Sequence, residues 1–77
     1  MAQITITTRP EEQDAVLQAI KELNGKVAAV STIARMTGLL QSRVRYAIED
    51  LIDAERIRKV PHKAFNKHYV RYSYEII

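Results

Sequence analysis

The stretch "STIARMTGLLQSRVRYAIEDLIDAERI", residues 31–57, has the pattern of two helices joined at a glycine. Gly38 interrupts the helical pattern, and Leu39 is the apolar residue expected to fill the junction. The second helix is expected over residues 40–54. Its apolar residues recur at helical spacing, so one face is expected to lie in a core. This stripe consists of Val44, Ile48, Leu51 and Ile52.

The opposite side of this second helix begins with polar and basic residues. For solubility alone, Lys or Glu would serve as well as arginine and tyrosine, so this composition favours contact with phosphates and base edges. The alternative is a solvated face on which Arg45 and Glu49 pair at i, i+4. The acids Asp50 and Asp53 come later in the helix. The outward residues of the first two turns are Gln41, Ser42, Arg43, Arg45 and Tyr46.

Upstream, the sequence predicts a strand and another helix. Residues 4–8, "ITITT", alternate apolar and polar β-branched side chains, which indicates a short half-buried strand. A helix then begins near Pro10, with Thr8 or Arg9 as its cap. It is expected to end at "NG", residues 24–25, because glycine tolerates a left-handed conformation. Its buried stripe is Val16, Leu17, Ile20, Leu23 and Val27.

The segment between these helices is short. Residues 26–30, "KVAAV", are too few for a separate helix and are predicted as one small strand. Ser31 or Thr32 is the expected cap of the following helix. The inward residues of that helix are predicted to be Ile33, Ala34 and Met36.

The C-terminal third reads as two strands around a basic loop. The first strand begins at Ile57 and is predicted to stop at Pro61, which has no N–H for a sheet ladder. Residues 62–68 form a polar loop, and residues 69–77 return as a strand in which Tyr72 and Tyr74 are interpreted as core or sheet residues. Phe65 in the loop has three interpretations: it covers the sheet, stacks on a base or sugar, or contacts a protein.

The charge is distributed unevenly along the 77 residues. Residues 1–55 hold six Lys/Arg and eight Asp/Glu, a net −2, whereas residues 56–77 hold six Lys/Arg and one Glu, a net +5. A basic tail on a near-neutral body favours an anionic partner that contacts mainly the tail.

Catalytic and metal-dependent functions are not expected. The chain has no cysteine and two histidines, and no carboxylate cluster accompanies the histidines in the sequence. Ser31, Ser42 and Ser73 have no histidine in a plausible catalytic relay, and the only glycines, Gly25 and Gly38, form no phosphate-binding loop. We therefore expect no enzyme activity, no cofactor, no metal and no small-molecule ligand.

A membrane location is not expected either. No apolar run approaches the roughly 20 residues of a membrane span. The first ten residues, "MAQITITTRP", lack the basic start and apolar stretch of a signal peptide. A cytoplasmic location is the expectation.

The predicted order is strand, helix, short strand, helix, helix, strand, basic loop, strand. With "VSTIARMTGLLQSRVRYAIEDLIDAERIRKV" at its centre, the chain resembles the winged helix-turn-helix superfamily over residues 11–77. It is similar to small bacterial regulators of the multiple-antibiotic-resistance, GntR and fimbrial-operon types. The resemblance implies an α+β fold with three helices, a small antiparallel sheet and a C-terminal β-hairpin wing. One domain, 1–77, would comprise an N-terminal strand extension (1–9), a three-helix core (10–55, helix-turn-helix at about 31–54) and the wing (56–77).

The chain departs from the family pattern at two positions. Leu40 occupies the place of the usual Ser or Thr cap, which leaves Gln41 or Ser42 as alternative starts of the helix. Glu55 occupies a place where many members carry glycine, and it is strained if its φ is positive.

The resemblance implies a transcriptional regulator that binds double-stranded DNA. In helix-turn-helix proteins the start of the second helix contacts base edges in the major groove, which assigns that role to Gln41, Ser42, Arg43, Arg45 and Tyr46. A module of this size has a small DNA interface, so a homodimer or cooperative binding is expected. The alternatives are a protein-interaction module of a larger complex and an RNA-binding winged helix. Phosphate contacts from the wing are assigned to Arg58, Lys59, Lys63, Lys67, His68 and Arg71.

Overall fold

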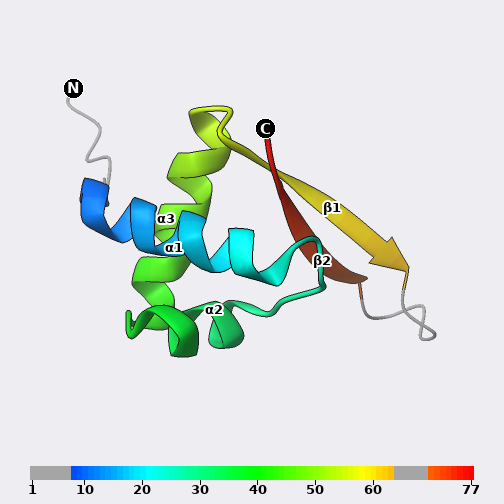
Figure 1. Ribbon diagram of the computed structural model, residues 1–77, viewed down its shortest axis with the longest axis horizontal. Helices are drawn as coiled ribbons and strands as arrows, with labels where there is room; N and C mark the ends of the chain where they lie inside the picture. The colour runs from blue at the N-terminus through cyan, green and yellow to red at the C-terminus, as the bar shows by residue number, and fades with distance from the viewer. Residues whose placement is uncertain (1–7, 64–69) are drawn as a thin grey trace, which may run out of the picture.

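The computed structural model describes residues 8–63 and 70–77, and there it confirms the predicted fold class (Figure 1). Three helices precede a two-stranded antiparallel sheet, an α+β arrangement consistent with a winged helix. The strand predicted at 4–8 lies outside the described residues except for Thr8, which is not in a strand. The elements are α1 (Pro10–Leu23), α2 (Val30–Thr37), α3 (Gln41–Asp53), β1 (Ile57–Lys63) and β2 (Val70–Ile76).

Both ends of α1 follow from local chemistry. Arg9 is the cap, and its N–H donates to the Glu12 side chain at 3.0 Å, which is one half of a capping box. At the other end Asn24 has φ 48° and Gly25 has φ 83°. The left-handed conformation expected of Gly25 is confirmed, but Asn24 already occupies the C-cap.

The strand predicted at 26–30 is wrong. Val30 is the first residue of α2, and the preceding segment meets the sheet through a backbone hydrogen bond from the Ala28 N–H to the Tyr72 carbonyl, 3.1 Å. A single such bond fixes the segment against β2 without forming a ladder. Residues 26–29 therefore connect α1 to α2 without forming a strand.

Two predictions for α2 also need correction. Its N-cap is Ala29, so the helix begins before Ser31 and Thr32 and neither residue caps it. Met36 is 41% exposed, because it lies about 200° around the helix from the buried Ala34. The predicted end is confirmed, since Gly38 caps α2 with φ 77°.

The hairpin extends past the proline at which β1 was predicted to stop. Pro61 pairs with Tyr72, and β1 continues to Lys63. The Tyr72 carbonyl is turned away from β1, since it accepts from Ala28. The Pro61–Tyr72 pair is therefore a non-hydrogen-bonded pair, in which the missing N–H of proline costs the ladder nothing.

The core lies among the three helices and one face of the hairpin. Figure 1 shows α1 crossing α3, with the hairpin leaving the C-terminal end of α3. The stripe predicted for α3 is largely confirmed: three of its residues are buried and Ile52 is half-buried. Leu39 packs against the core as expected, and Tyr74 belongs to the core. The largest fully buried side chains are Val16, Ile33, Val44, Leu51 and Ile57.

Candidate nucleic-acid interface

The start of α3 presents polar side chains to solvent. Gln41, Ser42 and Arg45 are exposed, as the apolar pattern predicted, whereas Tyr46, which was also predicted to face outward, is half-buried. The helix begins at Gln41 with Leu40 as its N-cap, which confirms Gln41, and not Ser42, as the start of the helix. Within the described part of the chain, Arg45 forms no salt bridge with Glu49, so the guanidinium of Arg45 is available at this surface.

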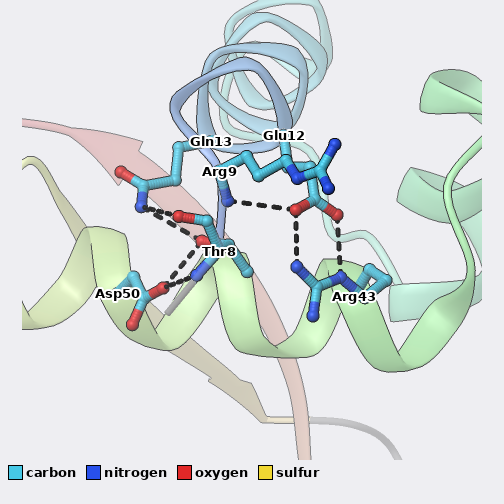
Figure 2. Close-up of polar contacts among 6 residues, drawn as sticks. All are labelled: Thr8, Arg9, Glu12, Gln13, Arg43 and Asp50. Carbon is cyan, nitrogen blue, oxygen red and sulfur yellow. Dashed lines mark hydrogen bonds and ion pairs between the residues drawn. The ribbon is translucent and has the colours of Figure 1, made fainter. Parts of the chain in front are cut away.

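Arg43 differs from its neighbours because it faces α1. Its Nε donates to Glu12 Oε2 at 2.8 Å and its second terminal nitrogen donates to Glu12 Oε1 at 2.6 Å (Figure 2). The two side chains retain only 32% and 13% of their exposure, respectively. Such a bidentate pair fixes both the position and the plane of the guanidinium. Arg43 is therefore a bridge between helices in this structure, whereas the sequence placed it among the residues that contact bases.

Seven residues further along α3, Asp50 makes a second bridge to the start of α1. Its Oδ2 accepts from the Thr8 N–H at 2.9 Å and from the Thr8 hydroxyl at 2.7 Å (Figure 2). Gln13 adds a bond from its Nε2 to the Thr8 hydroxyl oxygen at 3.0 Å. Spacing of seven residues places Arg43 and Asp50 on the same side of α3. We call the four residues Thr8, Glu12, Arg43 and Asp50 the α1–α3 bridge.

The charges of the α1–α3 bridge reinforce each other. The hydrogen bonds from Arg43, followed by the bond from the Arg9 N–H, lower the pKa of Glu12 from 4.5 to about 2. In turn the hydrogen bond to Glu12 raises the pKa of Arg43. Both groups are thus held in their charged forms around neutral pH.

The cations of the hairpin lie in different surroundings. Arg58 stands opposite Glu75 in the sheet register and its Nε donates to Glu75 Oε2 at 2.7 Å, so it is already paired within the hairpin. On the other face of the sheet, the Lys59 Nζ lies 4.0 Å from the centre of the Tyr72 ring, a cation–π contact. Arg71 is exposed.

Of the other residues predicted to contact phosphates from the wing, the structure describes only one. Lys63 is the last residue of β1, whereas Lys67, His68 and the loop residue Phe65 lie outside the described residues. Arg56, which the prediction omitted, is exposed immediately before β1. The prediction left it out of the phosphate-contacting set although it is the first residue of the predicted wing, 56–77, and carries the same charge as Arg58.

A groove separates the start of α2 from the hairpin. Lys59, Arg71 and Tyr72 line one side of it, and Ala29 and Thr32 line the other. Two exposed cations thus stand at the groove together with the N-terminal end of α2, where the helix dipole is positive. The electrostatic character of this face favours an anionic partner.

One serine forms a hydrogen bond with a histidine, a contact that was not predicted from the sequence. His62 Nε2 and Ser73 Oγ are 2.7 Å apart across the hairpin. The contact was missed because it joins residues on neighbouring strands, diagonal to the pairs Val60–Ser73 and His62–Arg71. Ser73 is 2% exposed, so its hydroxyl is shielded from a substrate. The bond therefore links the side chains of β1 and β2 and stabilises the hairpin.

In residues 8–63 and 70–77, no three His, Asp or Glu side chains gather as ligands for a metal ion. None of the helices there combines the length and the apolar character that a bilayer span requires. No family model, curated protein or solved structure matches this chain.

Proposed function

We propose that this protein is a transcriptional regulator that binds double-stranded DNA, with α3 in the major groove and the hairpin on the flanking phosphates. The observation that carries the proposal is the exposed start of α3, where Gln41, Ser42 and Arg45 stand together on the helix that follows α2. In helix-turn-helix proteins, which this arrangement resembles, the start of the second helix contacts base edges.

Each of these side chains suits a different group on DNA. Arginine at position 45 forms two parallel hydrogen bonds to guanine O6 and N7, and glutamine at position 41 pairs with adenine N6 and N7. Ser42 and the half-buried Tyr46 donate to phosphates, for which a hydroxyl is sufficient. Arg43 is not part of this set, because its guanidinium is bound to Glu12.

The hairpin supplies charge rather than sequence discrimination. Lys59 and Arg71 border the groove beside α2, where a phosphate meets two cations and the positive end of a helix. Arg58 contributes less, since Glu75 neutralises it within the hairpin. A single module of this kind buries roughly 600–1,000 Å² of its own surface on DNA, so we propose that two copies bind together at a site.

A protein-interaction module is the second candidate. The observation in its favour is that Glu49 and Asp53 are exposed on α3, where they oppose the field of the basic residues. Negative charge on the same helix weakens attraction to a phosphate backbone but is compatible with a mixed protein surface. On this alternative the protein would bind a partner and would show no salt-dependent affinity for DNA.

The two candidates are distinguished by fluorescence anisotropy with a labelled mixed-sequence duplex over a range of salt concentrations. About four to six phosphate contacts predict a slope of log affinity against log salt near −4 to −5. Arg71→Ala should reduce the slope by about 1, and Arg45→Ala should weaken binding. Lys21→Ala, which removes an exposed charge from the last turn of α1, is the matched control and should change neither quantity. Equal losses in the control, or no binding at low salt, would reject the proposal.

A further inference from the structure

We infer that Leu40 is a specificity residue that recognises the methyl group of thymine, an inference that rests on the proposed DNA binding. Leu40 is the N-cap of α3 and its side chain is 74% exposed. It precedes Gln41, so it stands at the edge of the surface proposed to enter the major groove.

Local folding does not explain a leucine at this position. An N-cap residue is normally Ser, Thr, Asp or Asn, whose side-chain oxygen accepts a bond from a free N–H of the first turn. Leucine has no acceptor, and α3 therefore begins without a side-chain cap. The side chain is also not used in the core, which Leu39 enters instead. A residue that breaks two local rules without a compensating contact is a candidate for a functional role.

The chemistry of the side chain narrows that role to one base. Leucine neither donates nor accepts a hydrogen bond, so it cannot bind a phosphate or the polar edge of a base. In the major groove, thymine is the base that presents a methyl group, and apolar side chains recognise it by contact. Removing one such carbon from an apolar contact weakens binding about fourfold. Leu40 therefore selects thymine at the position opposite the start of α3, beside the bases contacted by Gln41.

The test begins with selection of bound duplexes from a random-sequence pool by the wild-type protein. In the enriched duplex each thymine is then replaced in turn by deoxyuridine, which removes only the methyl group. We expect the affinity of the wild type to fall about fourfold at one or two positions. Leu40→Ala should bind the thymine and deoxyuridine forms equally at those positions.

Two further variants separate the contact from effects on folding. Leu40→Ser supplies the missing cap, so it should raise the melting temperature and still lose the preference for thymine. Ile77→Ala removes an apolar side chain of similar exposure, 72%, and should retain the preference. Ile77 lies at the far end of α3, because its N–H donates to the carbonyl of Arg56. The 13 residues of α3 separate it from Leu40 by about 20 Å.

The outcomes distinguish this inference from the proposed function. If no duplex is retained, DNA binding itself is rejected and the role of Leu40 is rejected with it; if duplexes are retained without enrichment of any sequence, DNA binding stands and the role of Leu40 is overturned. If a sequence is enriched but deoxyuridine has the same effect on the wild type and on Leu40→Ala, DNA binding stands and the thymine contact is overturned. The inference is supported if the wild type and Ile77→Ala bind the thymine duplex more tightly than the deoxyuridine duplex and the two Leu40 variants bind both equally.

Discussion

Arg43 on α3 and Glu12 on α1 form a bidentate ion pair, with nitrogen–oxygen distances of 2.8 and 2.6 Å (Figure 2). Together with the bonds from Thr8 to Asp50, this pair ties one side of α3 to the first turn of α1. The exposed residues at the start of α3 are thereby held in a fixed orientation relative to the rest of the helices. A surface that contacts base edges needs such support, because small displacements of its side chains weaken the contacts.

The Arg43–Glu12 pair should stabilise the fold. Arg43→Ala leaves the carboxylate of Glu12, whose side chain is only 13% exposed, without its main partner. The midpoint of urea unfolding should therefore fall with little change in slope. Arg45→Ala is the matched control, since it removes an exposed arginine from the same turn of α3. A stabilising role for the pair would be contradicted if the two variants unfolded at the same urea concentration.

The same pair predicts a dependence of stability on acid pH. The pKa of Glu12 is about 2 in the folded chain, against 4.5 for the unperturbed group. Its contribution is therefore fully present above about pH 4.5 and is lost as the pH falls toward 2, because the unfolded chain takes up the proton first. Unfolding followed by circular dichroism between these pH values should show a shallower loss for Glu12→Gln than for the wild type. Parallel curves would mean that other carboxylates control acid unfolding.

Asp50 should contribute to the stability of the fold through its hydrogen bonds with Thr8. Asp50→Ala removes the acceptor of two bonds from Thr8, and the buried Thr8 hydroxyl then loses a charged partner. We expect a loss of about 1.5–3 kcal/mol in the free energy of unfolding, measured by urea denaturation. Asp53→Ala, an exposed acid at the end of the same helix, should change stability by less than about 0.5 kcal/mol.

The turn between α3 and β1 contains a strained residue. Glu55 has φ 57°, a conformation that costs a residue with a side chain about 1–2 kcal/mol relative to glycine. Glu55→Gly should therefore raise the free energy of unfolding by about 1 kcal/mol, since glycine recovers that strain and loses some entropy on folding.

Ala54→Gly is the control for this prediction. Ala54 is the preceding residue and has φ −82°, so glycine relieves no strain there. The substitution should lower stability by about 0.5–1 kcal/mol. Thermal unfolding of the two variants should give changes of opposite sign, and a loss of stability in both would contradict the proposed strain.

The sequence predicted those features that depend on local spacing. The repeat of Val44, Ile48 and Leu51 located the buried face of α3, and Gly38 located the end of α2. The same spacing identified Gln41 and Arg45 as exposed residues. Hydrophobic periodicity and the conformations of glycine depend only on residues close together in the chain, so both can be recognised in the sequence without knowledge of the fold.

The features that were missed depend on residues far apart in the chain. Arg43 and Glu12 are 31 positions apart and Asp50 and Thr8 are 42 apart, so neither pair leaves a signal in local spacing. Pro61 was predicted to end β1 because proline has no N–H to donate to a partner strand. Whether its nitrogen faces the partner strand depends on the register with β2, which the sequence does not show. Arg43 was assigned to the DNA-contacting set for the same reason. Helical spacing places Arg43 outside the apolar stripe of α3, but it does not show that Glu12 of α1 binds the Arg43 side chain.

The most direct test of the proposed function is a map of amide chemical shifts in ¹⁵N-labelled protein as a mixed-sequence duplex is added at low salt. We predict the largest changes at residues 40–46 and at Lys59 and Arg71, with small changes along the exposed side of α1. Salt should reverse these changes, because released counterions contribute to the affinity. Changes that cluster on α1, or spectra that do not change at an excess of duplex, would contradict the proposal that α3 and the hairpin bind DNA.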